Sequence, residues 1–159
     1  MGLETVFTMD MSSIKFGPGV TREVGEDLKS MGVRRPLLIT DGNLGAGQIV
    51  GGVLDVLTKG GLDFHFYDQV RVEPTDESFQ HAIRFAVERE VDGFLAVGGG
   101  STIDTAKAAN LYATYPADFL EYVNPPIGKG TPVPGPLKPL VAVPTTAGTG
   151  SETTGVAIF

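Results

Sequence analysis

The chain has 159 residues, a formal net charge of −7, 42% hydrophobic residues and no cysteine. This length and composition allow one globular domain with a hydrophobic core, and the lack of cysteine rules out disulfides and thiolate metal ligands. The negative charge without clustered Lys and Arg excludes nucleic acid as an expected partner, and no apolar run of about 18 residues exists to cross a membrane.

The N-terminal residues show no secretory signal. Glu4 and Asp10 lie among the first ten residues, which lack the basic-then-apolar order of a signal peptide. We therefore expect a cytoplasmic protein. Residues 7–16 are a candidate for an extra strand or hairpin before the first helix.

Short apolar runs alternate with helical periodicity along the rest of the chain. Four runs are typical of buried strands: residues 37–39, 64–66, 94–97 and 140–143. Apolar side chains at helical spacing mark four helices: Val24, Leu28 and Met31; Ile49, Val53 and Leu57; residues 76–90, with Phe79, Ile83, Ala86 and Val87 on one face; and residues 101–113. This alternation predicts an α/β fold, a Rossmann-like and mainly parallel sheet with helices on both faces.

Two features of the C-terminal third concern domain organisation. Residues 124–139 contain six prolines and cannot form a helix or a central strand, so we expect an exposed loop within the domain. The chain ends on the apolar residues 156–159, whereas natural termini are usually surface segments. We therefore expect that residues 1–159 are one domain of a longer protein.

The first candidate site follows the strand expected at 94–97. Glycines 98–100 lead there into a helix, and Ser101 and Asp104 have the spacing of a capping box at its start. Open parallel sheets bind ligands at the carboxyl ends of their strands, and free N–H groups at a helix start attract phosphate. A tight turn without a ligand is the alternative, because Ile103 stands where the usual dinucleotide fingerprint has its third glycine.

The second candidate site is PTTAGTGSE, residues 144–152, directly after the strand expected at 140–143. It supplies hydroxyls and flexible backbone at the carboxyl end of another strand, so it should open into the same crevice. Such groups suit a pyrophosphate, a ribose or a carboxamide. A solvated Ser/Thr turn is the alternative, but two such loops after two strands favour a shared ligand.

Asp41 is the third candidate, at the end of the strand expected at 37–39. A carboxylate at such a strand end can accept both ribose hydroxyls of NAD and would repel the 2′-phosphate of NADP. An Asx-turn or a helix cap before Gly42 is the alternative.

The two histidines form no site. His65 and His81 lie on different expected elements with no carboxylate pattern around them, so we expect structural or surface roles. Because no Ser/His/Asp set or carboxylate pair stands out either, we expect a domain that binds a cofactor but contains no catalytic centre.

The motifs GGGSTIDTAKA (98–108) and PTTAGTGSE (144–152), in this order and after the strand that carries Asp41, resemble the iron-containing alcohol dehydrogenases. The likeness runs from about Phe16 to the end of the chain. It implies the N-terminal, nucleotide-binding domain of a dehydroquinate synthase-like two-domain fold. The helical C-terminal domain of that fold, absent here, holds a divalent metal, iron or zinc. The resemblance therefore implies no catalytic and no metal-binding residue in this chain.

The resemblance also assigns the contacts with NAD. Four residues around the start of the expected helix would hold its pyrophosphate: Gly99, Gly100, Ser101 and Thr102. Three threonines of the second loop would contact the cofactor nearer its adenine and nicotinamide portions: Thr145, Thr146 and Thr149. Asp41 would contact its ribose.

Four further segments resemble the hydroxyacid-oxoacid transhydrogenase branch of that family: VRVEPTD (70–76), KAANLYA (107–113), PIGKG (126–130) and GSETTGVAIF (150–159). Glu73 stands where many other members have Asn. The likeness implies transfer of hydride by bound NAD from a hydroxy acid or alcohol to an oxo acid, namely from 4-hydroxybutyrate to 2-oxoglutarate. In the absence of the second domain, an exposed apolar patch on the cleft face would favour self-association, so a homo-oligomer is a further expectation. Two alternatives stay open: an ordinary NAD-dependent alcohol dehydrogenase, and a non-catalytic nucleotide-binding module.

Overall fold

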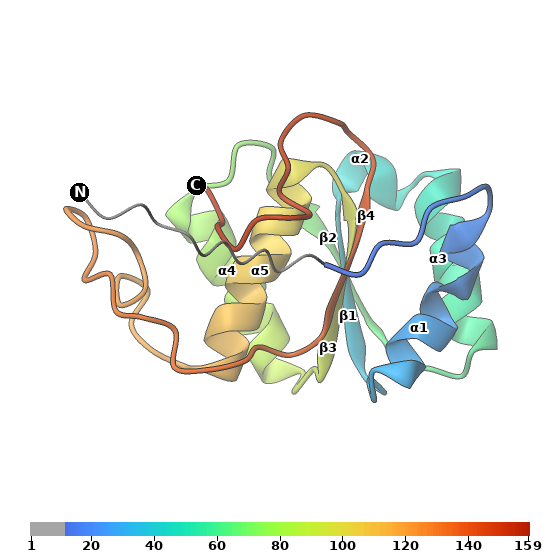
Figure 1. The fold of residues 1–159 in the computed structure, drawn as a ribbon, viewed down its shortest axis with the longest axis horizontal. Coiled ribbons are helices and arrows are strands. Elements are labelled where there is room, and N and C mark those ends of the chain that lie inside the picture. The colour runs from blue at the N-terminus through green and yellow to red at the C-terminus, as the bar shows by residue number, and fades with distance from the viewer. Residues whose placement is uncertain (1–11) are drawn as a thin grey trace, which may run out of the picture.

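A four-stranded parallel sheet with helices on both faces forms the centre of the computed structural model, which describes residues 12–159 (Figure 1). The strands are β1 (Pro36–Asp41), β2 (His65–Val70), β3 (Gly93–Gly98) and β4 (Leu140–Pro144), and they lie in the order β2-β1-β3-β4. Each neighbouring pair is parallel. The predicted Rossmann-like α/β fold is confirmed.

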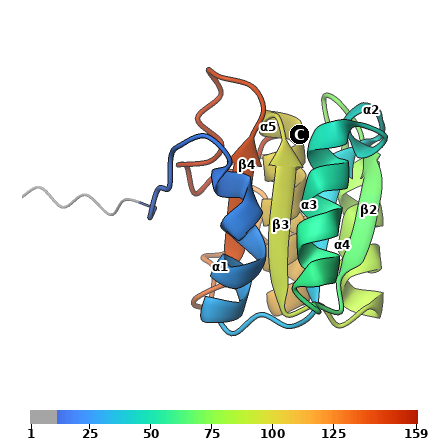
Figure 2. The same ribbon diagram turned by 90° about the vertical axis from the view of Figure 1, so that its right-hand side faces the viewer.

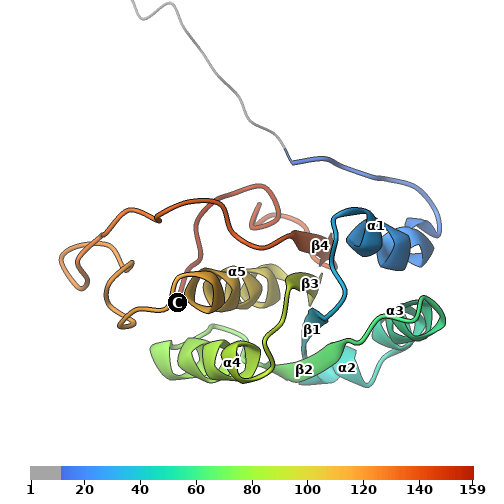
Figure 3. The same cartoon turned by 90° about the horizontal axis from the view of Figure 1, so that it is seen from below.

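The helices form one layer on each side of the sheet (Figure 3). One layer holds α1 (Val24–Ser30), which follows the short 3₁₀ turn η1 (Val20–Glu23), and α3 (Gln48–Lys59). The other holds α4 (Asp76–Glu88) and α5 (Gly100–Thr114), and the short helix α2 (Gly42–Gly45) begins directly after β1. Crossover helices between parallel strands explain why both faces of the sheet are covered.

The core has two parts, one under each helix layer. Alternate residues of a strand point to opposite faces, so Leu37 and Phe94 pack toward α4 and α5, whereas Leu38 and Leu95 pack toward α1 and α3. All four side chains are fully buried. The continuous apolar runs of β1 and β3 therefore reflect strands that are buried on both faces.

Three side chains that helical spacing places in the core are exposed instead: Met31, Ile49 and Val87, at 50%, 54% and 46%. Met31 is the C-cap of α1 and lies just beyond the helix. In α3 the residue next to Ile49, Val50, is buried, and in α4 Ala82 is buried. Apolar residues at i and i+4 fit more than one stripe of a helix, and only packing against the sheet selects among them.

Two further expectations concern segments outside the sheet. Residues 12–16 form no strand, contrary to the expectation for residues 7–16, of which 7–11 lie outside the described range. The proline-rich segment is a loop between α5 and β4, as predicted. No helix of the described range combines the length and apolar character that crossing a membrane requires.

The topology brings the carboxyl ends of β1 and β3 together. Figure 2 shows the sheet from the side of α1 and α3, with β3 and β4 behind these helices. These two strands are neighbours, but the chain leaves β1 toward β2 on one side and leaves β3 toward β4 on the other. In open α/β sheets, ligands bind in the crevice at such a switch point. Asp41 ends β1 and the glycine run ends β3, so both candidate elements lie at this switch point.

Candidate functional site

The glycine run joins β3 to α5 without a capping side chain. Gly99 is the N-cap, the helix begins at Gly100, and no side chain of the described residues bonds to this cap. The predicted capping box is therefore wrong: the helix starts one residue early, Ser101 lies within its first turn, and Asp104 is buried at 6% exposure. An uncapped helix start leaves N–H groups and the positive end of the helix dipole available to an anion.

The Ser/Thr loop, residues 144–152, packs directly against the glycine run. The Thr145 amide donates to the Gly98 carbonyl at 2.9 Å. A Cβ on Gly99 would come within 3.0 Å of the Thr146 hydroxyl oxygen. A Cβ on Gly100 would come within 2.8 Å of the Thr149 methyl group. A Cβ on Gly100 would force Thr149 to move, and one on Gly99 would crowd Thr146, so glycine permits this close approach and the structure brings the two candidate loops together as one surface.

The seven candidate residues of these loops differ in exposure. Thr145, Thr146 and Thr149 are exposed, and Gly99, Gly100 and Ser101 are half-buried, so these six can be reached by a ligand. Thr102 is buried, with only 2% of its surface exposed, and its side chain lies where a Cβ on Gly98 would be. Its predicted contact with a pyrophosphate stays a prediction, and the visible role of its side chain is to pack beneath the turn.

Asp41 is the N-cap of α2. Its Oδ1 accepts hydrogen bonds from the amides of Asn43, at 2.9 Å, and Leu44, at 3.1 Å. The helix-cap alternative is thus confirmed. These bonds occupy only one of the two carboxylate oxygens, and the side chain is half-buried at the switch point. The contact with a ribose stays a prediction that this geometry permits.

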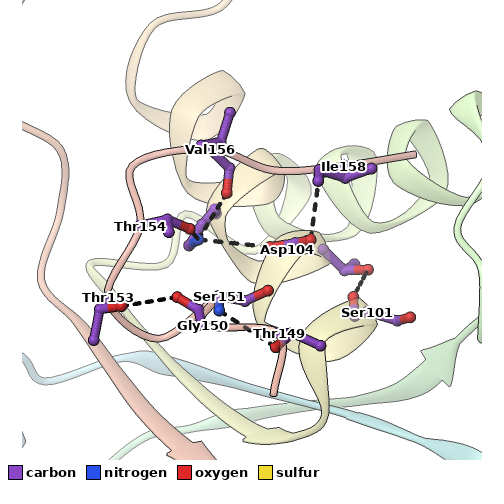
Figure 4. Close-up of polar contacts among 11 residues, drawn as sticks. Ser101, Asp104, Thr149, Gly150, Ser151, Thr153, Thr154, Val156 and Ile158 are labelled. Carbon is purple, nitrogen blue, oxygen red and sulfur yellow. Dashed lines mark hydrogen bonds and ion pairs between the residues drawn. The ribbon is translucent and has the colours of Figure 1, made fainter.

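Sequence reasoning missed a polar cluster on α5. The Lys107 ammonium donates to the Val156 carbonyl at 2.7 Å and to the Thr154 hydroxyl at 3.2 Å. Asp104 accepts from the amide of Ile158 at 3.2 Å and lies 3.5 Å from the Lys107 ammonium (Figure 4). An acidic and a basic residue three positions apart on an otherwise uncharged, Ala-rich helix were the signal that could have revealed it.

The histidines lie outside the loop surface. The Tyr67 hydroxyl of β2 and Nδ1 of His81 on α4 are 2.9 Å apart, and burial raises the pKa of Tyr67 to about 12. His65 lies at the start of β2. Within residues 12–159, no group of three or more His, Asp or Glu side chains is arranged to hold a metal ion.

One hollow of about 520 Å³ lies at the opposite end of the sheet. Ala86, Asp92 and Lys138 are among its lining residues, and the last two precede β3 and β4. Burial lowers the pKa of Lys138 there. Because this hollow is at the amino ends of the strands, it is separate from the two candidate loops.

Comparisons with known proteins agree with this geometry. The sequence profile of a family described as iron-containing alcohol dehydrogenase matches residues 12–159. The chain is 64% identical over 154 residues to the hydroxyacid-oxoacid transhydrogenase, mitochondrial, of Bos taurus, and the match covers 96% of this chain and 33% of that protein. The protein of the same name from Homo sapiens is 60% identical over 154 residues, with the same coverage. The chain thus spans about a third of the length of these relatives.

Solved structures show the same fold. The NADH-dependent butanol dehydrogenase A of Thermotoga maritima superposes with a TM-score of 0.83 at 28% identity, covering 94% of this chain and 37% of that one. A 1,3-propanediol oxidoreductase superposes with a TM-score of 0.81 at 31% identity, covering 94% and 38%.

The names of the relatives correct one expectation. The transhydrogenases of Bos taurus, Mus musculus and Homo sapiens are named mitochondrial, which contradicts the cytoplasmic location expected from the N-terminal residues. That expectation tested only for a secretory signal. Mitochondrial targeting segments have a different composition, and the residues of a folded domain do not encode its compartment.

Proposed function

The chain belongs to the iron-containing alcohol dehydrogenase family, and we propose that it is the NAD-binding domain of a mitochondrial oxidoreductase. The observation that carries this proposal is the packing of Thr146 and Thr149 against Gly99 and Gly100 at the carboxyl ends of two parallel strands. This packing creates one surface that offers free amides, hydroxyls and glycine backbone that a ligand can approach closely, which suits a dinucleotide.

Each part of NAD has matching groups on this surface. The pyrophosphate would accept from the amides at the start of α5, where the helix dipole favours negative charge. The exposed threonine hydroxyls of the second loop would bind acceptors nearer the adenine and nicotinamide. The second carboxylate oxygen of Asp41 would accept from ribose hydroxyls, and its charge would disfavour NADP. When bound, the nicotinamide supplies the hydride acceptor and donor of the reaction.

The described residues do not fit a metal site, since they contain no suitable cluster of ligands. We propose that a divalent metal, iron or zinc, and the catalytic residues belong to a further, helical domain, so that residues 1–159 form only the cofactor half of the enzyme. The role of this half is to bind and orient NAD.

The proposed reaction of the complete enzyme is transfer of hydride from 4-hydroxybutyrate to 2-oxoglutarate. The alcohol loses a hydride to bound NAD and a proton to the protein or solvent, and the oxo acid gains one of each. The identity of 64% to a hydroxyacid-oxoacid transhydrogenase supports a hydroxy acid as the donor and an oxo acid as the acceptor. An ordinary NAD-dependent alcohol dehydrogenase is the second candidate, supported by the likeness to an NADH-dependent butanol dehydrogenase at 28% identity.

Calorimetric titration of the chain with NADH and NADPH tests the cofactor site. We expect saturable binding of NADH and weaker binding of NADPH. Absence of NADH binding would contradict the NAD-binding proposal and favour a module for another small ligand. Sedimentation of the same sample tests the predicted self-association.

The reaction is tested on the complete enzyme with 4-hydroxybutyrate and 2-oxoglutarate. A transhydrogenase turns over many times with NAD present only at the concentration of the enzyme, because the cofactor is reoxidised in place. A requirement for one free NAD per turnover would favour the ordinary dehydrogenase.

A further inference from the structure

The Ser/Thr loop is anchored at both ends to the β3–α5 unit, the unit that carries the glycine run. The upstream anchor is the hydrogen bond from the Thr145 amide to Gly98. The downstream anchor is the pair Asp104 and Lys107, which binds the segment 154–158 after the loop (Figure 4). The two candidate loops are therefore attached to one rigid element.

The downstream anchor is a largely buried ion pair. The side chains of Asp104 and Lys107 are 9% and 15% exposed, and their charged atoms are 3.5 Å apart. Both project from α5, whose backbone is fixed by its own hydrogen bonds. Segment 154–158 has no helix or strand of its own. Its position therefore depends on side-chain contacts of this kind.

A short turn connects this anchor to Thr149. The amide and hydroxyl of Thr153 both donate to the Gly150 carbonyl, at 2.9 and 3.0 Å. Ser151 is buried, with 7% of its surface exposed, and its amide donates to the Thr149 hydroxyl at 3.3 Å. Thr149 in turn lies against Gly100. A continuous series of contacts thus runs from Lys107 to the surface proposed to bind the pyrophosphate.

We propose that Asp104 and Lys107 are positioning residues for the cofactor site, acting through the loop that they anchor. This inference rests on the proposed function. The pair holds Thr149 against Gly100 before the cofactor arrives, so that binding does not have to order the loop. A loop released from this anchor loses backbone entropy on binding, and this cost weakens affinity.

The test is the double variant Asp104→Asn/Lys107→Met, which removes both charges together and so leaves no unpaired buried charge. We expect its dissociation constant for NADH to rise about tenfold, the effect of having to order the backbone of about one loop residue on binding. The conservative variant Lys107→Arg should keep affinity near that of the wild type. The matched control is Glu121→Gln/Lys129→Met, which neutralises the ion pair between Lys129 of the proline-rich loop and Glu121 shortly before it, and should leave the constant unchanged.

Hydrogen exchange separates positioning from general stability. In the double variant, the amides of Ser151 and Thr153 should exchange faster, while those of β3 exchange as in the wild type. In a Thr149→Ala background, the same double substitution should change the NADH constant much less, because residues that act through one another are not additive. Should the double variant not fold, Thr154→Val removes one hydrogen bond on the loop side and keeps both charges. It should weaken NADH binding about twofold, which corresponds to the low end of the net contribution of one hydrogen bond.

Three results would overturn the inference. Faster hydrogen exchange of the loop in the double variant with unchanged NADH affinity would show that the pair is merely structural. Weaker affinity with unchanged loop exchange would show that the pair does not act through the loop. If the wild-type chain binds no NADH, the proposed function itself fails, and this role fails with it. The wild-type titration thus tells the two failures apart.

Discussion

The hydroxyl of Thr40 donates a 2.7 Å hydrogen bond to the main-chain carbonyl of Val97, at the point where β1 and β3 separate. Backbone pairing of the two strands ends one residue earlier, at Ile39 and Ala96. Both Thr40 and Val97 are fully buried. The bond therefore supplies a donor at the base of the switch point, from which Asp41 and the glycine run emerge.

Replacing Thr40 by Val should lower the free energy of unfolding by about 1–3 kcal/mol, because the Val97 carbonyl loses a buried partner while the shape of the side chain is kept. Thr40→Ser retains the hydroxyl and is the control for polarity. Urea unfolding followed by circular dichroism measures both. Equal stability of Thr40→Val and the wild type would show that the bond contributes nothing.

Gly100→Val should abolish or strongly weaken NADH binding, because its Cβ would come within 2.8 Å of the Thr149 methyl group and displace the Ser/Thr loop. An overpacking cost of about 1–3 kcal/mol corresponds to roughly 5- to 150-fold in affinity. Gly17→Val is the matched control, since nothing lies within 4 Å of a Cβ there. Calorimetric titration measures the dissociation constant of NADH for both variants, and retained affinity in Gly100→Val would place the cofactor elsewhere.

Asp41 allows its two roles to be separated. Asp41→Asn keeps an oxygen that can accept from Asn43 and Leu44, so thermal stability should stay near the wild type while the preference for NADH over NADPH falls. Asp41→Ala also loses the cap, which costs about 1 kcal/mol. Melting curves and paired titrations with both cofactors measure these effects. An unchanged preference in Asp41→Asn would limit this residue to capping.

Tyr67 should make stability fall at high pH. Burial raises the pKa of Tyr67 from an ordinary value of 10.0 to about 12 in the folded state. A raised pKa means that the stabilising contribution is complete below pH 10 and is lost as the pH rises through about 12. Tyr67→Phe should flatten the stability curve in this range and remove the last step of the phenolate absorbance titration. A titration of Tyr67 near its ordinary value would contradict this.

Secondary structure could be predicted from the sequence because it depends on local patterns. The apolar runs of β1 and β3 are short, continuous and bounded by proline, threonine or glycine, which is typical of strands buried on both faces. The prolines before β4 excluded regular structure by their missing N–H groups. Which stripe of a helix faces the sheet was less certain, as the exposed Met31, Ile49 and Val87 show.

The candidate loops were identifiable for the same reason, since glycine and threonine after a strand have a local meaning. The role of Asp104 was not. Its spacing from Ser101 matched a cap, but the structure buries it against segment 154–158 and begins the helix at Gly100. A capping motif concerns four neighbouring residues, whereas the contact with Ile158 joins residues 54 positions apart.

The residue pattern alone thus determines the α/β class, the approximate strands and helices, and the two loops with groups suited to a dinucleotide. The tertiary structure decides the order β2-β1-β3-β4, the packing of Thr149 against Gly100 and the anchoring of the loop by Asp104 and Lys107. The reason is physical: backbone preferences and amphipathic periodicity act over a few residues. The choice of neighbours among strands and loops instead depends on which packing of the whole chain buries the most apolar surface and satisfies buried polar groups.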